Sequence, residues 1–272
     1  TIRYMQKALG YALTGDTSEQ AMFMLYGTGS NGKSTFLNIF SAVINTYAQS
    51  ASSDAFMQKK NESVNNDIAR LKGARFVTAI EMEENKRLAE SLIKSMTGGD
   101  KLVTRFLYGE FFEYVPQFKV FLAANHKPII RDTTHSIWRR IKLMPFENTF
   151  TEANRDKHFA DKIMAKEMPG ILAWAVKGCL LWQREGIQDP PSVKGRQRST
   201  GRKWTHSQRS LRNAVRHGKV SVYRTKCCVL PMTSGAKTTA NMHFPSARSA
   251  RSFWKWALKR SVPQAQEPWN GS

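Results

Sequence analysis

The ten residues YGTGSNGKST, at positions 26–35, constrain the fold of this chain more than any other stretch. Gly27, Gly32, Lys33 and Ser34 fit the pattern G-x-x-x-x-G-K-[S/T] without a mismatch. Glycines let successive backbone N–H groups point at one phosphate, which side chains would otherwise obstruct. The pattern predicts a phosphate-binding loop made of Gly27, Thr28, Gly29, Ser30, Asn31, Gly32, Lys33, Ser34 and Thr35.

The segments on either side of this loop have the required pattern. Residues 21–27 (AMFMLYG) form a short apolar run that ends in glycine, which predicts a buried strand. Residues 33–46 carry apolar side chains at helical spacing. Because a strand precedes the loop and a helix follows it, we prefer a phosphate-binding loop to the alternative, a chance Gly/Ser-rich loop.

The chemistry of such a loop assigns roles to several side chains. Lys33 would neutralise the β- and γ-phosphate oxygens of ATP, and Ser34 would hold Mg²⁺. A second apolar strand, 74–84, ends in acids, of which Glu81 would organise Mg²⁺ and Glu83 would orient the attacking water. The alternative is that Glu83 and its neighbour only open the next helix, where acids favour the positive dipole end. ATP and Mg²⁺ are therefore the expected cofactors.

Further polar residues follow two other apolar runs. Asn125 ends the strand expected over 118–125, where it would position water beside the γ-phosphate or simply cap the turn. Arg139 and Arg140 precede a strand expected over 141–146. Adjacent arginines there are either solvated or supply an arginine finger, the positive charge that stabilises a transferred phosphoryl group.

Strands and helices alternate along the first 193 residues, which predicts an α/β fold with a largely parallel sheet. Residues 101–116 predict a hairpin that turns at Gly109-Glu110. Helices are expected over 2–13, 33–46, 86–96, 153–167 and 169–185.

The positive charge is concentrated at one end of the chain. The net charge is +21, and residues 194–272 hold 17 Lys/Arg against a single acid. Such charge favours a nucleic-acid partner. This segment lacks convincing helical periodicity and reads either as a basic nucleic-acid-binding tail or as an out-of-frame or decayed end without a fold. We prefer the second, because the segment is enriched in Arg, Ser, Trp and Cys and nearly free of acids. No run of 18 apolar residues is present, so no membrane span is expected.

The order of these parts resembles the superfamily 3 helicases, and more closely the helicase part of phage and plasmid primase–helicases of the poxvirus type. The match covers residues 2–193. It is carried by Gly27–Thr35, by VTAIEMEENKRLAESLIKSMTGGDKLVTRFLYGEFFEYVPQFKVFLAANHKP at 77–128, and by IWRRIKLMPF at 137–146.

This resemblance implies a set of catalytic roles. Lys33 and Ser34 would be the Walker A residues, and Asn125 would be the sensor. Glu81 and Glu83 would be the Walker B acids. Arg139 or Arg140 would act on the ATP of a neighbouring subunit, since the family works as a ring that is usually hexameric.

The resemblance also implies a DNA-binding region between the Walker B acids and the sensor. Lys94, Lys101 and Arg105 would bear on single-stranded DNA, and the hairpin around Tyr108 would project into the ring's channel. A basic groove that follows phosphates and aromatics that stack on bases would suit that role. Four aromatic side chains of the hairpin could instead belong to the core, and we prefer the core for most of them. They are Phe106, Phe111, Phe112 and Tyr114.

We therefore expect a P-loop NTPase (AAA+-like) core with a mostly parallel central sheet, helical flanks and a basic C-terminal tail. The expected divisions are a helical remnant of an N-terminal region (1–20), the ATPase/helicase core (21–150), a helical subdomain (151–193) and the tail (194–272).

The expected function is that of an ATP-dependent DNA helicase in phage or plasmid replication, acting in the cytoplasm of a bacterial host cell. Single- and double-stranded DNA, a homo-hexameric ring and a primase domain on the full-length chain are the expected partners. The alternative is an inactive prophage-derived fragment that binds nucleotide or DNA without unwinding. A small-molecule kinase is disfavoured, because it would not call for the hairpin, the Asn-ended strand and the arginine pair in this order.

Overall fold

A computed structural model describes residues 2–58, 66–80, 86–126, 128–130, 132, 135–191 and 193. Its centre is a parallel sheet in the order β2-β3-β6-β1-β7. The strands are β1 (Met22–Tyr26), β2 (Ala48–Ser50), β3 (Phe76–Ala79), β6 (Lys119–Ala124) and β7 (Ile141–Pro145). The expected α/β fold with a mostly parallel sheet is confirmed. The expectations for Glu81, Glu83 and residues 194–272 lie outside the described residues.

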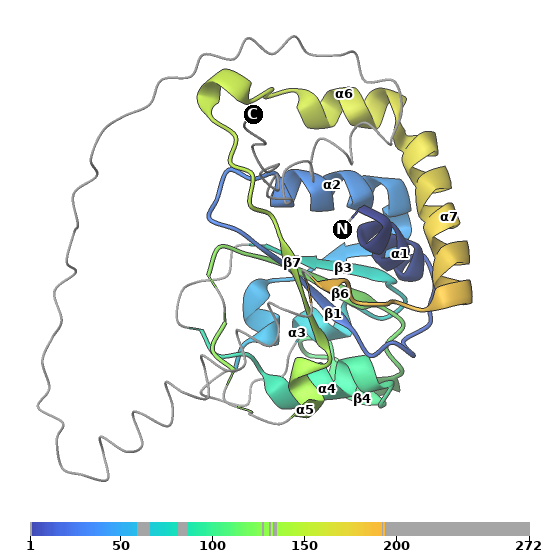
Figure 1. Cartoon of the computed structure of the whole chain (residues 1–272). Helices are drawn as coiled ribbons and strands as arrows, with labels where there is room; N and C mark the ends of the chain where they lie inside the picture. The colour runs from blue at the N-terminus through green and yellow to red at the C-terminus, as the bar shows by residue number, and fades with distance from the viewer. Residues whose placement is uncertain are drawn as a thin grey trace, which may run out of the picture.

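Helices cover both faces of this sheet (Figure 1). In that view α2 (Lys33–Ile44) and α6 (Phe159–Lys166) lie above the sheet, and α3 (Asn66–Ala69), α4 (Glu90–Gly98) and α5 (His135–Trp138) lie below it. At one end α1 (Ile2–Ala12) packs beside α7 (Met168–Glu185). Short 3₁₀ turns are η1 (Asn45–Tyr47), η2 (Ser53–Phe56) and η3 (Glu152–Asn154).

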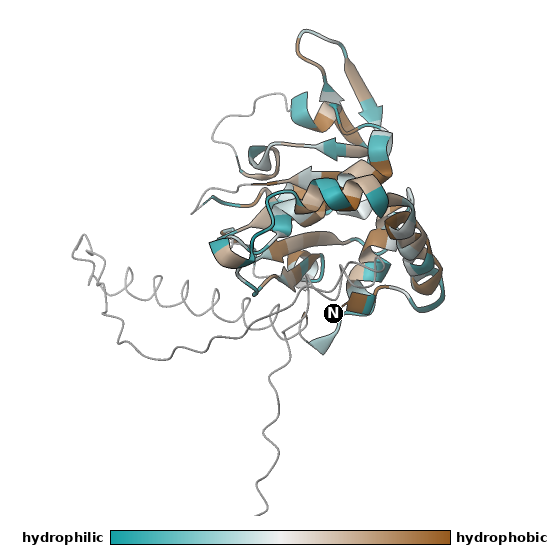
Figure 2. Ribbon diagram, turned by 90° about the horizontal axis from the view of Figure 1, so that it is seen from above, coloured by the Kyte–Doolittle hydropathy of each residue, from teal (hydrophilic) through white to brown (hydrophobic). Residues whose placement is uncertain are grey.

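The central strands are apolar on both faces, which explains why they read as continuous apolar runs. Phe23 and Leu25 of β1 belong to the core shared with α1, α2 and α7, whereas Met22 and Met24 belong to the core on the other face. The helices in Figure 2 show both hydrophilic and hydrophobic residues along their length, as expected of helices that cover a sheet with one side.

The carboxyl ends of the parallel strands meet at one edge of the sheet. There β1 lies between β6 and β7, so that Tyr26 pairs with Ala124 on one side and Pro145 on the other. Segments that leave these three strands therefore start side by side. In open α/β sheets this edge is where ligands bind, and the glycine-rich loop leaves it from β1, between β6 and β7.

A separate antiparallel pair, β4 (Leu102–Arg105) and β5 (Phe111–Tyr114), forms the expected hairpin. Leu102 pairs with Tyr114, and Arg105 pairs with Phe111 next to the turn. Tyr108, at the turn, has a positive φ of 61°. That conformation is uncommon for a bulky residue and marks the tip as a tightly shaped turn.

Helices α1 and α7 cross with their backbones in contact. A Cβ added to Gly178 would lie 2.0 Å from the carbonyl oxygen of Gln6, and one added to Gly10 would lie 2.0 Å from the backbone nitrogen of Cys179. Only glycine at both positions permits this approach, so the two helices form one tightly joined pair.

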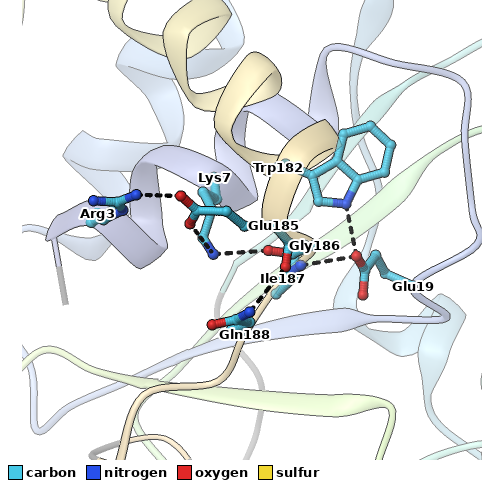
Figure 3. A network of polar contacts seen from close by, with 8 residues as sticks. All are labelled: Arg3, Lys7, Glu19, Trp182, Glu185, Gly186, Ile187 and Gln188. Atoms are coloured by element: carbon cyan, nitrogen blue, oxygen red, sulfur yellow. Dashed lines mark hydrogen bonds and ion pairs between the residues drawn. The ribbon is translucent and has the colours of Figure 1, made fainter.

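Polar contacts fix the ends of the same helix pair (Figure 3). The Lys7 ammonium donates to the carbonyl of Gly186 at 2.8 Å and lies 3.5 Å from the Glu185 carboxylate. From the turn after α1, the Glu19 carboxylate accepts a 2.8 Å hydrogen bond from the Trp182 indole. Because Lys7 is buried, these partners compensate a charge that would otherwise be costly inside the protein.

The helix expected over 86–96 was placed four residues too early, since α4 begins at Glu90. Instead, Arg87 forms a parallel bridge with Ile129, and Leu88 forms an antiparallel bridge with Met57. Leu88 is buried by this pairing, so its apolar character comes from bridge contacts rather than from a helical face.

Two other expectations differ in their bounds. The helix expected over 153–167 begins only at Phe159, because residues 151–158 are all exposed and offer no apolar face to pack. The strand β2, inside the polar stretch after residue 46, was not expected, since only its parallel pairing with β3 holds it at the sheet edge. Among the described residues no helix is both long and apolar enough to cross a membrane.

We expect Gly178→Ala to destabilise the protein by about 1–3 kcal/mol, because the new methyl group would collide with the α1 backbone. Urea unfolding followed by circular dichroism measures the change. Gly15→Ala is the matched control, because a Cβ there meets only the Gln117 side chain at 3.5 Å. Equal stability of the two variants would contradict the tight crossing of α1 and α7.

Candidate active site

The loop between β1 and α2 is shaped by left-handed backbone conformations. Gly29, Ser30 and Gly32 have φ values of 105°, 44° and 79°. Alternation between left- and right-handed conformations turns successive N–H groups into one concavity, which suits an anion. Serine rarely adopts a positive φ, so the surrounding contacts must hold Ser30 in place.

Gly27 is the position where the loop touches the strand next to it. A Cβ at Gly27 would lie 2.1 Å from the Asn31 side-chain nitrogen and 2.1 Å from the Phe146 carbonyl oxygen. No side chain fits there without moving backbone. The first glycine of the motif is therefore required by close packing, in addition to its role in leaving space for a phosphate.

Hydrogen bonds attach the loop to the segment that follows β7. The Asn31 amide nitrogen donates to the Phe146 carbonyl at 2.9 Å, and the Phe150 backbone N–H donates to the Ser30 carbonyl at 2.7 Å. The Asn31 side chain is buried, so this amide has lost its hydration and depends on these partners. The segment that follows β7 thus holds the phosphate-binding loop in place.

Lys33 is 5% exposed and makes three hydrogen bonds with its ammonium group. It donates to the Gly27 carbonyl at 2.8 Å, to Asn31 Oδ1 at 2.7 Å and to Asn125 Oδ1 at 2.9 Å. Burial lowers the pKa of Lys33. The structure therefore brings together the predicted Lys33 and Asn125, which are 92 residues apart in the chain.

Helix α2 begins at Lys33, and Gly32 at its N-cap provides no side-chain hydrogen bond. The first N–H groups of a helix have no partner inside the helix and carry a partial positive charge. The start of α2 has no side-chain cap and follows a loop whose concavity suits an anion. It is therefore suited to bind a phosphate group.

A cavity of about 630 Å³ opens over the loop. One wall comprises residues 29–36. The carboxyl ends of β3 and β6 contribute Ile80, Ala123 and Asn125, and the chain after β7 contributes Phe150, Asn154, Arg155, Asp156, Lys157, Phe159 and Ala160. A volume of this size suits a nucleotide-sized ligand.

The predicted magnesium ligands are only partly within the described residues. Ser34 lines the cavity and is exposed to it, next to Lys33, whereas Glu81 and Glu83 lie outside the described residues. Within the described ranges, no group of three or more His, Cys, Asp or Glu side chains could hold a metal ion. Mg²⁺ commonly binds through one or two protein oxygens, phosphate and water, so the Ser34 hydroxyl fits it as a ligand.

The two arginines at the start of β7 differ strongly in environment. Arg140 is 8% exposed and donates to Thr97 Oγ1 at 3.1 Å and to the Ser136 carbonyl at 2.6 Å. Arg139 is exposed and donates to Gln20 Oε1 at 2.5 Å. Both precede the amino end of β7, whereas the phosphate-binding loop leaves the carboxyl end of β1. Neither lines the cavity of its own chain.

Two of the predicted DNA-binding lysines are in ion pairs. Lys94 on α4 lies 2.5 Å from the Asp132 carboxylate, which is largely shielded from solvent. Lys101 lies 3.5 Å from the Glu113 carboxylate across the hairpin, and both side chains are well exposed. An exposed pair of this kind is weak and can exchange with a phosphate, whereas the Lys94 pair is already well compensated.

The hairpin tip exposes large apolar and aromatic side chains. Tyr108 is 96% exposed, and the Arg105 guanidinium lies over the Phe111 ring, 4.9 Å from its centroid. Phe106 and Phe111 are 48% and 62% exposed, so placing them in the core was wrong. Tyr114 is buried, as preferred from the sequence.

Residues 150–157 of the cavity wall were not predicted as part of the site. Arg155 and Lys157 are exposed there and carry positive charge. No motif marks them, because their relation to the loop depends on how β7 returns the chain over α2. The only sequence signal is a pair of basic residues between the last strand and the next helix.

Comparison with known proteins covers this same region. A family profile described as "Family of unknown function (DUF5906)" matches residues 25–140, from the end of β1 to the start of β7. "Putative helicase L207/L206" of Acanthamoeba polyphaga mimivirus is 30% identical over 208 residues, which are 70% of this chain and 22% of that protein.

Two further viral proteins are similar to this chain. "Putative helicase 022R" of Frog virus 3 (isolate Goorha) is 28% identical over 71% of this chain and 22% of its own length. "Primase D5" of Fowlpox virus (strain NVSL) is 24% identical over 56% of this chain and 20% of its own length. Over this segment the chain resembles viral helicases and a poxvirus primase. The chain spans about a fifth of the length of these relatives.

We expect Asn31→Ala to weaken ATP binding about tenfold, because the Phe146 carbonyl loses its donor and Lys33 loses one acceptor. Titration with a fluorescent ATP analogue measures the affinity. Asn38→Ala is the matched control, since Asn38 is exposed on α2 and is not among the residues that line the cavity. Unchanged affinity in Asn31→Ala would show that ATP binding does not depend on the hydrogen bond between the loop and the end of β7.

Proposed function

We propose that this chain is the motor part of an ATP-dependent DNA helicase of superfamily 3, in which ATP hydrolysis drives movement along single-stranded DNA. The observation that carries the proposal is the buried Lys33, held between the loop and Asn125 at the carboxyl edge of a parallel sheet. Relatives named as helicases and as a primase support a helicase or primase–helicase role in coarse terms.

In the proposed reaction the loop binds the phosphates of ATP through its backbone N–H groups and the start of α2. The Lys33 ammonium turns from protein oxygens to phosphate oxygens, and Asn125, released from Lys33, positions water. Mg²⁺, held by Ser34 and Glu81, would neutralise charge on the phosphates. Glu83 orients the attacking water.

The separation of Arg139 from the cavity supports a site shared between subunits. The strand β7 has five residues, and a strand rises about 3.3 Å per residue, so Arg139 lies about 16 Å from the loop along the sheet. An arginine finger from this position would act on the ATP of a neighbour. We favour Arg139 over Arg140, because Arg140 is buried and hydrogen-bonded within its own chain.

The exposed hairpin supports a DNA-binding role. Tyr108 and Phe111 offer faces on which bases stack, while Arg105 and Lys101 supply positive charge for phosphates. Arg105, Tyr108 and Phe111 form a small aromatic and basic surface at the turn end of the two-stranded ribbon, and Lys101 lies at its other end, just before β4. In the proposed ring we assign this exposed tip to contact with DNA in the channel.

We further propose a homo-hexameric ring, a primase domain elsewhere on a longer protein, and a role in phage or plasmid replication in the cytoplasm of a bacterial host. The position of Arg139, outside the cavity of its own chain, supports ring assembly. The relative named as a primase, of which this chain covers 20%, supports the primase domain.

We expect Lys33→Ala to abolish ATP hydrolysis, because the loop loses the cation that faces the phosphates. Phosphate release under saturating ATP and Mg²⁺ measures turnover. Lys177→Ala, an exposed lysine on α7, serves as the control and retains turnover. Persistent hydrolysis by Lys33→Ala would reject the assigned site.

We expect Tyr108→Ala to weaken binding of single-stranded DNA about tenfold, since stacking on an aromatic side chain contributes about 1–3 kcal/mol per base. Fluorescence anisotropy with a labelled oligothymidine measures the affinity. Tyr47→Ala removes another exposed aromatic side chain, far from the hairpin in sequence and on a different sheet edge, and leaves the affinity unchanged. An unaltered affinity in Tyr108→Ala would remove the hairpin tip from the DNA site.

A further inference from the structure

The segment between β7 and α6 forms the cavity wall that faces the phosphate-binding loop. It contributes Arg155 and Lys157, both exposed at the mouth of the cavity. Neither side chain makes a hydrogen bond or an ion pair with another described residue. Two cations therefore line the same cavity as the phosphate-binding loop.

The acid between them is already neutralised. The Asp156 carboxylate lies 2.8 Å from the Lys162 ammonium and accepts a 3.0 Å hydrogen bond from the His158 backbone N–H. The hydrogen bond from Lys162 holds the pKa of Asp156 below its usual value. Asp156 thus has partners at the start of α6, and the other charged side chains among the described lining residues are the cations Lys33, Arg155 and Lys157.

The loop itself offers a single cationic side chain, Lys33. The three hydrogens of the Lys33 ammonium all go to protein oxygens, and Arg139 and Arg140 lie outside the cavity of their own chain. A triphosphate carries several negative charges on neighbouring oxygens. Besides Lys33, the cationic side chains among the described lining residues are Arg155 and Lys157, which can add to the charge that Mg²⁺ supplies.

We propose that Arg155 and Lys157 bind the phosphate groups of the nucleoside triphosphate from the side opposite Lys33. Arginine's planar guanidinium can contact two phosphate oxygens at once, and the lysine acts as a mobile point charge. A nucleotide held in this way joins the phosphate-binding loop to the segment that leads into α6 and α7. The inference rests on the proposed function, because it assumes that this cavity takes ATP.

Equilibrium titration of the full chain with a fluorescent ATP analogue, at fixed ionic strength, tests the proposal. The double variant Arg155→Ala/Lys157→Ala is expected to bind about tenfold more weakly than the unmodified chain. Lys166→Ala is the matched control, because Lys166 is exposed on α6 outside the cavity lining, and it should bind as the unmodified chain does. Raising the salt concentration should reduce the difference between the double variant and the unmodified chain.

Thermal unfolding of the double variant without nucleotide should match that of the unmodified chain, because both side chains are exposed and have no hydrogen-bond or ion-pair partner among the described residues. Unchanged affinity of the double variant, together with lost affinity in Lys33→Ala, would overturn the inference and leave the proposed function intact. Unchanged affinity in Lys33→Ala would overturn both. An equal loss of affinity in Lys166→Ala would reduce the effect to general surface charge and overturn the inference.

Discussion

The contact between the glycine-rich loop and the end of β7 is the one on which the rest of the site depends. Asn31 bridges the Phe146 carbonyl and the Lys33 ammonium, and Gly27 lets the loop approach that carbonyl. The loop is thus fixed by the neighbouring strand as well as by its own sequence. A buried lysine with complete hydrogen bonding needs this support, because an unpaired buried charge would be strongly destabilising.

The same contact relates the site to the remainder of the molecule. The chain that leaves β7 at Phe146 passes over the loop at Phe150 and continues into α6 and α7. Helix α7 is joined to α1 by the close crossing at Gly178 and by the contacts of Glu19. A ligand that touches both the loop and the segment after β7 would therefore act on a continuous path from the sheet to the first helix.

Much of the sheet and the central part of the site could be predicted from sequence, for identifiable physical reasons. Doubly buried strands leave apolar runs, and a phosphate-binding loop requires glycines and a lysine at fixed spacing, so β1, β3, β6 and β7 and the Lys33 loop were found. The edge strand β2 and the start of α4 depend on pairing with distant segments. Such pairing leaves no periodic pattern of apolar residues in the local sequence. Arg155 and Lys157 were not predicted as site residues, because only the path of the chain after β7 brings them to the cavity.

The central claim is that ATP hydrolysis at this site is coupled to single-stranded DNA. The most direct test is the rate of ATP hydrolysis by the unmodified chain as a function of the concentration of single-stranded DNA. The account predicts basal turnover that rises several-fold and saturates as the DNA binds. Turnover that is unaffected by DNA, or no turnover with DNA and Mg²⁺ present, would contradict it.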